Sequence, residues 1–316
     1  MNTAVDSSYL PIDGSTVTLE TLKSFDLHCA LDGRIALYMG ANAELSDAIR
    51  ARQDEIDTAT LYVHKKDIIQ YNAYLEEVLG TILNHPGIDL TVKARAVFAA
   101  LGTLGKQVFA IPEEKHLKRY KMVAAEVSAF ILNNDNGYRA LSRMMDSTYS
   151  MSNHAINVGV TSMALAKKIL GNNPKYNYGE IGPGFFLHDI GNASVPVEVL
   201  NKKGPLSAVE WRLIRRHPQE GLRILSHVNM LSNEAKIIIA QHHERHNGSG
   251  YPKALTGDSI HVLGKICSIA DCFDSLTCQR PYRDKRPTFT ALKIMKQEMF
   301  KDFDPAFFQA FVLLLS

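Results

Sequence analysis

Apolar residues recur at helical spacing over most of the chain. From about Lys66 to Ser316 they follow steps of three and four residues, as in Val97, Leu101 and Leu104, which is the pattern of helices with one buried face. This part is therefore expected to be all-α. Clusters of turn-forming residues interrupt the pattern at residues 85–87, 133–137, 171–174, 204–205, 247–252 and 281–287.

The first 65 residues have a different pattern. Two short β-like runs, Phe25–Leu31 and Ile35–Met39, flank Asp32-Gly33, a dipeptide favoured in tight hairpin turns. An amphipathic stretch at Ala43–Ile56 and a further β-like run at Thr60–His64 follow. A small α+β module containing a β-hairpin is expected here, and its function cannot be read from the sequence.

The predicted fold is mainly α and has three parts. Residues 1–85 form the N-terminal α+β module, residues 86–135 a helical connector, and residues 136–316 a C-terminal helical bundle. The limits of the connector are left open, because the helices between residues 66 and 133 could belong to either side. No internal repeat or low-complexity tract is present.

Composition excludes several classes of protein. The net charge of the 316 residues is +2, so no overall cationic field favours a nucleic acid polymer or a membrane surface. The four cysteines show no CxxC spacing, which is typical of a reducing compartment. There is no secretory signal at the start and no later run of roughly 18 apolar residues. A cytoplasmic protein without a membrane span is expected.

Histidine is the least ordinary feature of the composition. Eight of the twelve histidines lie between His154 and His261. Burying so many titratable groups in apolar helices costs several kcal/mol apiece unless a compensating charge is present, and bound metal ions supply that charge. Seven His and Asp residues in apolar helical contexts are the candidate ligands: His154, His188, Asp189, His217, His242, His243 and Asp271.

The candidate ligands favour a catalytic centre with two metal ions. All are imidazoles or carboxylates, which disfavours a structural zinc site and suits iron, manganese or another first-row divalent ion. Seven ligands exceed the usual number around one ion, whereas two ions about 3.5–4 Å apart, bridged by a carboxylate and a hydroxide, use them all. Such a centre activates water and neutralises phosphate oxygens, so the sequence indicates phosphoester hydrolysis.

At these residues the chain resembles the HD-GYP family of HD-domain phosphohydrolases. His188-Asp189 supplies the HD pair, and residues 242–252 carry every defined position of the HHExxxGxGYP motif. The similar stretch runs from about Tyr138 to Ser316 and includes residues 270–276 and 280–283. The length of the second motif makes this a far stronger signal than a lone HD pair.

The resemblance implies a helical bundle with iron or manganese that opens cyclic di-GMP to pGpG and often on to GMP. It implies the same seven metal ligands, with Asp189 bridging the two ions and Asp189 and His188 in the catalytic centre. It places substrate contacts at the Gly250 backbone, Asp274, Arg280 and Arg283. Four basic residues against one acidic residue in 280–286 agree with phosphate binding there. It also implies a docking surface for diguanylate cyclase (GGDEF) domains on residues 248–252.

Two departures from the family pattern change the expectation. Members with three metals place a Glu four residues before the first ligand histidine, where this chain has Ser150, so two metals are expected. The family often reads HDxGK, whose lysine meets the substrate phosphate, whereas this chain has Asn192. Weaker phosphate binding or slower turnover follows, unless Lys202 or Lys203 takes the place of that lysine.

Three functions are compatible with the sequence. The leading one is a metal-dependent cyclic di-GMP phosphodiesterase in which a bridging hydroxide attacks phosphorus. The second is a cyclic-dinucleotide receptor that binds its ligand but cleaves it poorly, which Asn192 favours. The third is hydrolysis of another cyclic dinucleotide such as 3′,3′-cGAMP. The oligomeric state, a homodimer included, is left open.

Overall fold

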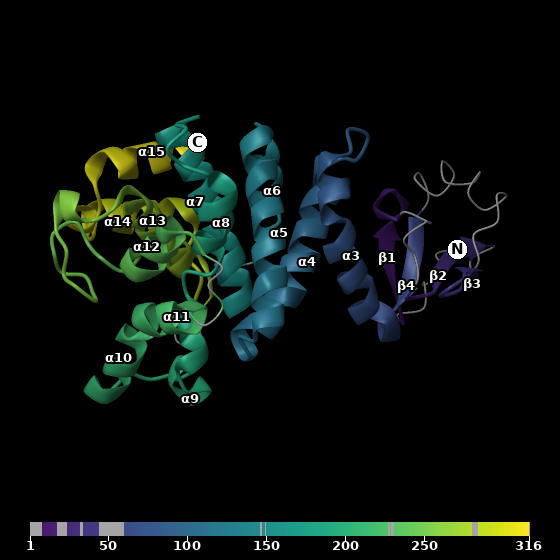
Figure 1. Cartoon of the computed structure of the whole chain (residues 1–316), viewed down its shortest axis with the longest axis horizontal. Coiled ribbons are helices and arrows are strands. Elements are labelled where there is room, and N and C mark those ends of the chain that lie inside the picture. The colour runs from purple at the N-terminus through teal and green to yellow at the C-terminus, as the bar shows by residue number, and fades with distance from the viewer. Residues whose placement is uncertain are drawn as a thin grey trace. The chain divides into compact units, whose positions relative to one another are not determined.

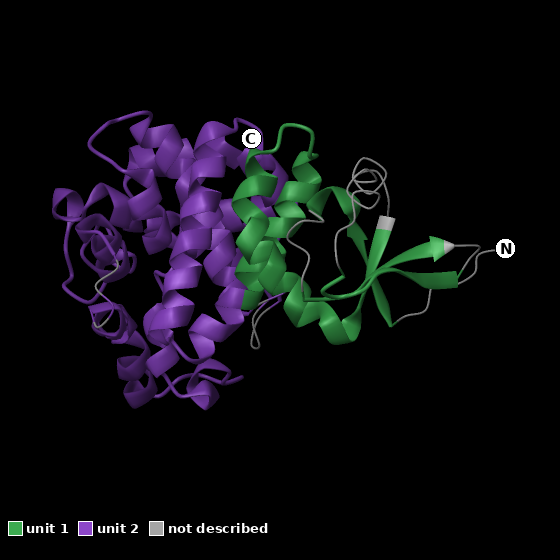
Figure 2. Ribbon diagram, turned by 45° about the vertical axis from the view of Figure 1, so that its right-hand side comes forward, with its two compact units in different colours: residues 1–103 green, residues 104–316 purple. Residues whose placement is uncertain are grey.

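The computed structural model describes residues 8–17, 24–31, 34–43, 60–145, 147–148, 150–226, 228, 231–279 and 284–315. The chain divides into two compact units, residues 1–103 and 104–316, shown in different colours in Figure 2. The division falls inside helix α4 (Leu90–Ala110). The three-part organisation with limits at 85/86 and 135/136 stays a prediction.

The N-terminal unit contains a four-stranded antiparallel sheet with the order β1-β4-β2-β3. The predicted hairpin is confirmed, because β2 and β3 pair with Ala30 opposite Ile35. Its turn, Asp32-Gly33, and most of the predicted amphipathic stretch 43–56 lie outside the described residues. The strands are β1 (Tyr9–Asp13), β2 (Leu27–Leu31), β3 (Arg34–Met39) and β4 (Thr60–His64).

Alternation along β4 fixes which face of the sheet is covered. Leu61 and Val63 are fully buried while Tyr62 is only partly covered, the period-two pattern of a strand with one core face. A short 3-10 turn, η3 (Lys65–Asp67), leads into helix α3 (Ile68–Asn84). The ring of Phe25 packs edge-on against Tyr71 of α3, with 5.4 Å between ring centroids. A further 3-10 turn, η1 (Gly14–Thr16), follows β1.

The C-terminal unit is helical, as Figure 1 shows, and the predicted mainly α fold is confirmed. Its helices are α5 (Glu114–Asn133), α6 (Gly137–Ser142), α7 (Met151–Leu170), α8 (Tyr178–Phe186), α9 (Val197–Leu200), α10 (Ala208–Arg215), α11 (His217–Ser226), α12 (Asn233–Gln241), α13 (Val262–Thr277), α14 (Thr288–Gln297) and α15 (Pro305–Leu315). The 3-10 turns are η4 (Ile190–Ser194), η5 (Gly257–Ser259) and η6 (Phe300–Asp302).

Helix α7 forms the centre of this unit. It packs against α5, α8, α13 and α15, and all but a few residues of its first four turns are buried. A helix surrounded on every side has apolar residues all round, and Ile156, Val160 and Leu165 show this pattern. His154 is a polar residue within this apolar interior. Among the described residues, no helix has both the length and the apolar character needed to cross a bilayer.

Candidate metal centre

Three of the seven candidate ligands lie at the C-terminal ends of helices. His188 follows α8, His217 follows α10, and His242 directly follows α12. In each case the ring Nδ1 donates a hydrogen bond to the carbonyl oxygen three residues earlier, at 2.8–2.9 Å. A helix end leaves such carbonyls without intrahelical partners, so the imidazole satisfies one of them. With Nδ1 holding the proton, Nε2 keeps its lone pair and is free to bind a metal.

His154 is oriented by a carboxylate instead. It lies in the first turn of α7, and its Nδ1 is 2.6 Å from Oδ2 of Asp274 on α13. Asp274 is itself buried, and its other oxygen accepts from Nδ2 of Asn157 at 2.8 Å. Asp271, one helical turn before Asp274, places Oδ1 3.3 Å from Nε2 of His154. The two aspartates of α13 therefore address opposite nitrogens of one imidazole.

An Asp274→Asn variant is expected to bind metal about 10–100-fold more weakly. A carboxylate that orients a ligand histidine also raises the basicity of that histidine, and the amide would not. The metal content of the purified variant after dialysis against a graded chelator would measure this. Asp135→Asn, which changes a carboxylate that is 98% exposed, is the matched control. Equal metal retention by Asp274→Asn and the control would contradict the orienting role.

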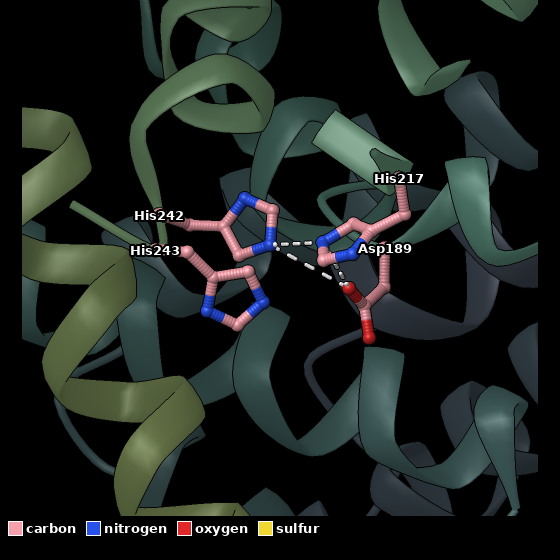
Figure 3. A group of neighbouring side chains, drawn as sticks. All are labelled: Asp189, His217, His242 and His243. Atoms are coloured by element: carbon pink, nitrogen blue, oxygen red, sulfur yellow. Dashed lines mark hydrogen bonds and ion pairs between the residues drawn. The ribbon is translucent and has the colours of Figure 1, made fainter. Parts of the chain in front are cut away.

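Asp189 lies between two groups of ligands. Its Oδ1 is 3.2 Å from Nε2 of His217 and 3.5 Å from Nε2 of His242. Its Oδ2 is 3.5 Å from Nε2 of His154 and 3.8 Å from Nε2 of His188. Figure 3 shows the side chains of Asp189, His217 and the adjacent His242 and His243 converging from three segments of the chain. The two oxygens of one carboxylate thus face two different sets of imidazoles, which is the geometry of a bridging ligand.

The seven residues fall into two clusters of metal-ligand type. The ligand atoms within each cluster lie within 4.8 Å of one another. His243 contributes to one cluster and is also 3.6 Å, through Nδ1, from Oδ2 of Asp271 in the other. The clusters are Asp189, His217, His242 and His243, and His154, His188 and Asp271.

The electrostatics of the cluster suit a cation. Burial lowers the pKa of His188 to about 4, and it also lowers the pKa of His217 and of His243. For Asp189 burial opposes ionisation, but the imidazoles of His188 and His217 outweigh it and hold its pKa well below the usual range. Neutral imidazoles and an ionised carboxylate are the forms that bind metal. All donors are nitrogen or oxygen, so the residues present fit divalent first-row ions.

Acid is expected to destabilise the metal-free protein. His188 has a pKa of about 4 when folded and about 6.5 when unfolded, so the unfolded chain binds more protons between these values. The free energy of unfolding therefore falls as pH falls through this window, by about 3 kcal/mol for this residue. His217 and His243 act in the same direction.

His154 adds nothing to the change within that window. Burial disfavours its charge, but hydrogen bonds to Asp189, Asp271 and Asp274 raise its pKa well above the usual value, so its stabilising contribution grows only as pH falls from that raised pKa to about 6.5 and is constant below. The three lowered imidazoles therefore set the direction of the change in acid. Urea unfolding in the presence of chelator at pH 6.5 and pH 5 measures the difference. Equal or greater stability at pH 5 would contradict the expectation.

A cavity of about 740 Å³ opens onto the cluster. His154, Asp189, His217, His243 and Asp271 line it, while His188 and His242 are completely buried behind. Of the predicted substrate contacts, Asn192 and Gly250 line this cavity. Asp274 lines a different cavity of about 510 Å³, and Arg280 and Arg283 lie outside the described residues.

The loop that follows His243 is held by a residue to which sequence reasoning gave no role. Glu244 is buried, and its two carboxylate oxygens accept backbone hydrogen bonds from Lys253 and Leu255 at 2.8 and 2.9 Å. Gly250 packs so closely that a Cβ there would lie 2.5 Å from the carbonyl oxygen of His243. Residues 248–252, the GYP loop, are therefore folded back onto the segment that carries His242 and His243.

Two further positions bear on the departures from the family pattern. Ser150 is the N-cap of α7, and its hydroxyl accepts from the backbone N–H of Asn153 at 3.0 Å. Lys202 and Lys203 both line the cavity, and Lys202 is paired with Glu210, with 2.7 Å between Nζ and Oε2. Asn192 is buried, and within the described part of the chain its Oδ1 has no hydrogen-bond partner.

Comparison with known proteins agrees with this geometry. Residues 182–307 match the HD domain family. The matched residues include the His188-Asp189 pair and the HHExxxGxGYP motif at residues 242–252. Curated relatives include a cyclic di-GMP phosphodiesterase of Pseudomonas aeruginosa, 35% identical over 187 residues that make up 59% of this chain and 44% of the relative. Another is the 3′3′-cGAMP-specific phosphodiesterase 2 of Vibrio cholerae, 44% identical over 31% of this chain and 19% of the relative.

The fold also matches a solved structure over nearly its whole length. That structure, titled as a HDG"Y"P protein from Bdellovibrio bacteriovorus, aligns with a TM-score of 0.66 at 22% identity and covers 97% of this chain and 99% of its own. At this identity the match supports the fold alone. The chain spans less than half of the length of the two curated relatives described above.

Proposed function

We propose that the chain is a metal-dependent phosphodiesterase that hydrolyses cyclic di-GMP to pGpG, GMP or both. The observation that carries the proposal is Asp189, whose two carboxylate oxygens face separate ligand clusters at the floor of an open cavity. Relatives named cyclic di-GMP phosphodiesterases match between 38% and 59% of this chain. Two divalent ions, iron or manganese, are proposed as cofactors.

The residues of the chain would bind and orient the metal ions and the substrate, and the ions would supply positive charge. When bound, two divalent ions would neutralise phosphate oxygens and make hydroxide available near neutral pH. The imidazoles hold their Nε2 lone pairs toward the cluster because Nδ1 is engaged by helix-end carbonyls. Asp189 stays ionised and directs one carboxylate oxygen toward each ligand cluster. The Gly250 backbone, Asn192, Arg280 and Arg283 are proposed as phosphate contacts, and Asp274 as the residue that orients His154.

Metal analysis combined with product identification tests the proposal. The protein is purified anaerobically, loaded with iron or manganese, and incubated with cyclic di-GMP, and the nucleotides are separated by chromatography. Release of pGpG or GMP with a metal content near two per chain is the expected result. Ser150 supports two metals and not three, because its hydroxyl caps α7. A filled metal site that binds cyclic di-GMP without releasing product would refute the enzyme.

A cyclic-dinucleotide receptor is the second candidate, and Asn192 favours it. An amide in the place of the family lysine carries no charge for a phosphate, and its Oδ1 has no partner among the described residues. An Asn192→Lys variant is expected to raise turnover of cyclic di-GMP by about tenfold, the effect of one charge-assisted hydrogen bond to phosphate. Steady-state rates for the variant and the natural chain measure this. Unchanged or lower turnover would show that Asn192 does not limit the hydrolysis of cyclic di-GMP.

Substrate choice between cyclic dinucleotides is a separate question. Relatives from Vibrio cholerae are named 3′3′-cGAMP-specific phosphodiesterases. Competition between cyclic di-GMP and 3′,3′-cGAMP in one reaction gives the ratio of their kcat/KM values directly. A ratio above one for cyclic di-GMP is expected. Docking of diguanylate cyclase domains on residues 248–252 and a cytoplasmic location stay predictions.

A further inference from the structure

A series of stacked side chains leads from the metal cluster to the surface. The ring of Tyr251 stacks on the ligand His243, with 4.6 Å between centroids and 29° between planes. The guanidinium carbon of Arg215 lies 5.6 Å from the centroid of the Tyr251 ring and 5.7 Å from that of Trp211. All four side chains line the cavity above the cluster. The metal centre is therefore continuous with a planar, cationic and aromatic surface.

Trp211 is at the outer end of this series. It is the only tryptophan in the chain and is 47% exposed. It stands four residues before Arg215 on α10, so both side chains are on the same face of the helix. A large aromatic ring left half in solvent at the mouth of a cavity forgoes part of the free energy of burial, and a stacking ligand would restore it.

The start of α10 is firmly held. Ser207 caps the helix by accepting from the N–H of Glu210, and the Glu210 carboxylate accepts from the N–H of Ser207 in return. Lys202 pairs with the same carboxylate. These contacts fix the first turn of α10, and Trp211 follows directly after it. The ring is thus presented from a rigid helix, as a stacking platform requires.

We propose that Trp211 and Arg215 form the binding site for a nucleobase of the substrate, which rests on the function proposed above. A flat purine can stack on the exposed face of Trp211, as bases stack on aromatic side chains in nucleotide-binding proteins. The guanidinium of Arg215 can donate to O6 and N7 of guanine, the commonest specific contact to that base. The phosphates would then lie toward the metal cluster, and the base would point outward along the cavity.

A base suits this surface better than a phosphate does. A phosphate is bound by charge and hydrogen-bond donors alone, and an indole ring offers a single N–H donor and a large apolar face. The preference for guanine over adenine would come from Arg215, because adenine presents a donor where guanine presents O6. Trp211 itself would stack on either base.

Fluorescence of the single tryptophan tests the site without relying on turnover. The full chain loaded with metal is titrated with GMP, which carries one base, and separately with inorganic phosphate, which carries none. Saturable quenching by GMP and none by phosphate is the expected result. Equal responses to the two probes, or no response to GMP, would overturn the proposal.

Kinetics of three variants provide the second readout. Trp211→Ala is expected to raise KM for cyclic di-GMP about tenfold or more, the loss of one stacked base, with kcat changed less than threefold. Trp211→Phe retains a stacking ring and is expected to restore most of the affinity. Val209→Ala, at a 57% exposed position on the same helix outside the cavity lining, controls for damage to α10 and is expected to behave as the natural chain.

The outcomes separate this inference from the proposed function. Trp211→Ala with unchanged KM, or with a loss confined to kcat, would overturn the stacking site while the phosphodiesterase stands. Trp211→Phe as defective as Trp211→Ala would overturn it as well, because shape and not stacking would then matter. Absence of hydrolysis by the natural chain would count against the phosphodiesterase alone, since the GMP titration does not depend on turnover.

Discussion

An Asp189→Asn variant is expected to lose cyclic di-GMP hydrolysis by at least about 1000-fold. Asp189 faces both ligand clusters, with Oδ1 near His217 and Oδ2 near His154. An amide offers one oxygen and one N–H group, so one cluster would meet a donor where it needs a ligand. Loss of charge stabilisation at a two-metal centre is worth about 4 kcal/mol or more, which corresponds to this factor in rate.

The measurement is kcat with metal content determined on the same sample. Metal content falling toward one per chain is expected to accompany the loss of rate. Asp258→Asn, which changes a fully exposed carboxylate in η5, is the control and is expected to keep the natural rate. Full metal content with undiminished kcat in Asp189→Asn would refute the bridging assignment.

A Gly191→Ala variant is expected to lose more than about 3 kcal/mol of unfolding free energy, in the range of severe overpacking. A Cβ at this position would overlap the carbonyl oxygen of His217 and lie 2.6 Å from the backbone nitrogen of Gly221. Both obstacles are backbone atoms, so no rotamer change relieves them. Turn η4 and helix α11, which pack against each other here, would have to separate.

The effect is expected to reach the metal centre as well, because His217 is the first residue of α11. Urea unfolding gives the loss of stability, and metal titration gives the loss of affinity. Gly204→Ala is the matched control, since a Cβ there meets nothing within 4 Å and a change within about 0.5 kcal/mol is expected. Similar stability of the two variants would show that η4 tolerates displacement from α11.

Much of the fold was predictable from local pattern. The hairpin of β2 and β3, strand β4 and the helical character of the C-terminal part follow from spacing that neighbouring residues share. The seven candidate ligands could also be singled out, because polar residues in apolar helices are conspicuous. The structure brings them into two adjacent clusters.

The functions of the surrounding residues were not predictable in the same way. Asp274 contacts His154 across 120 residues of sequence, and no local spacing indicates such a pairing. Glu244 follows two ligand histidines in the sequence and was given no role there, yet both of its oxygens hold the GYP loop. Trp211 and Arg215 were not singled out from the sequence, and only the fold places Arg215 beside Tyr251.

The histidines at the ends of α8, α10 and α12 also imply an order of binding. Each helix carries a partial negative charge of about half an electron at its C-terminus, and the terminal carbonyls lie one imidazole ring away from the cluster. Three such ends add to the ionised Asp189 and Asp271. In the proposed enzyme, bound cations would offset this negative charge before a phosphate approaches. The metal ions would then bind first and the dinucleotide second.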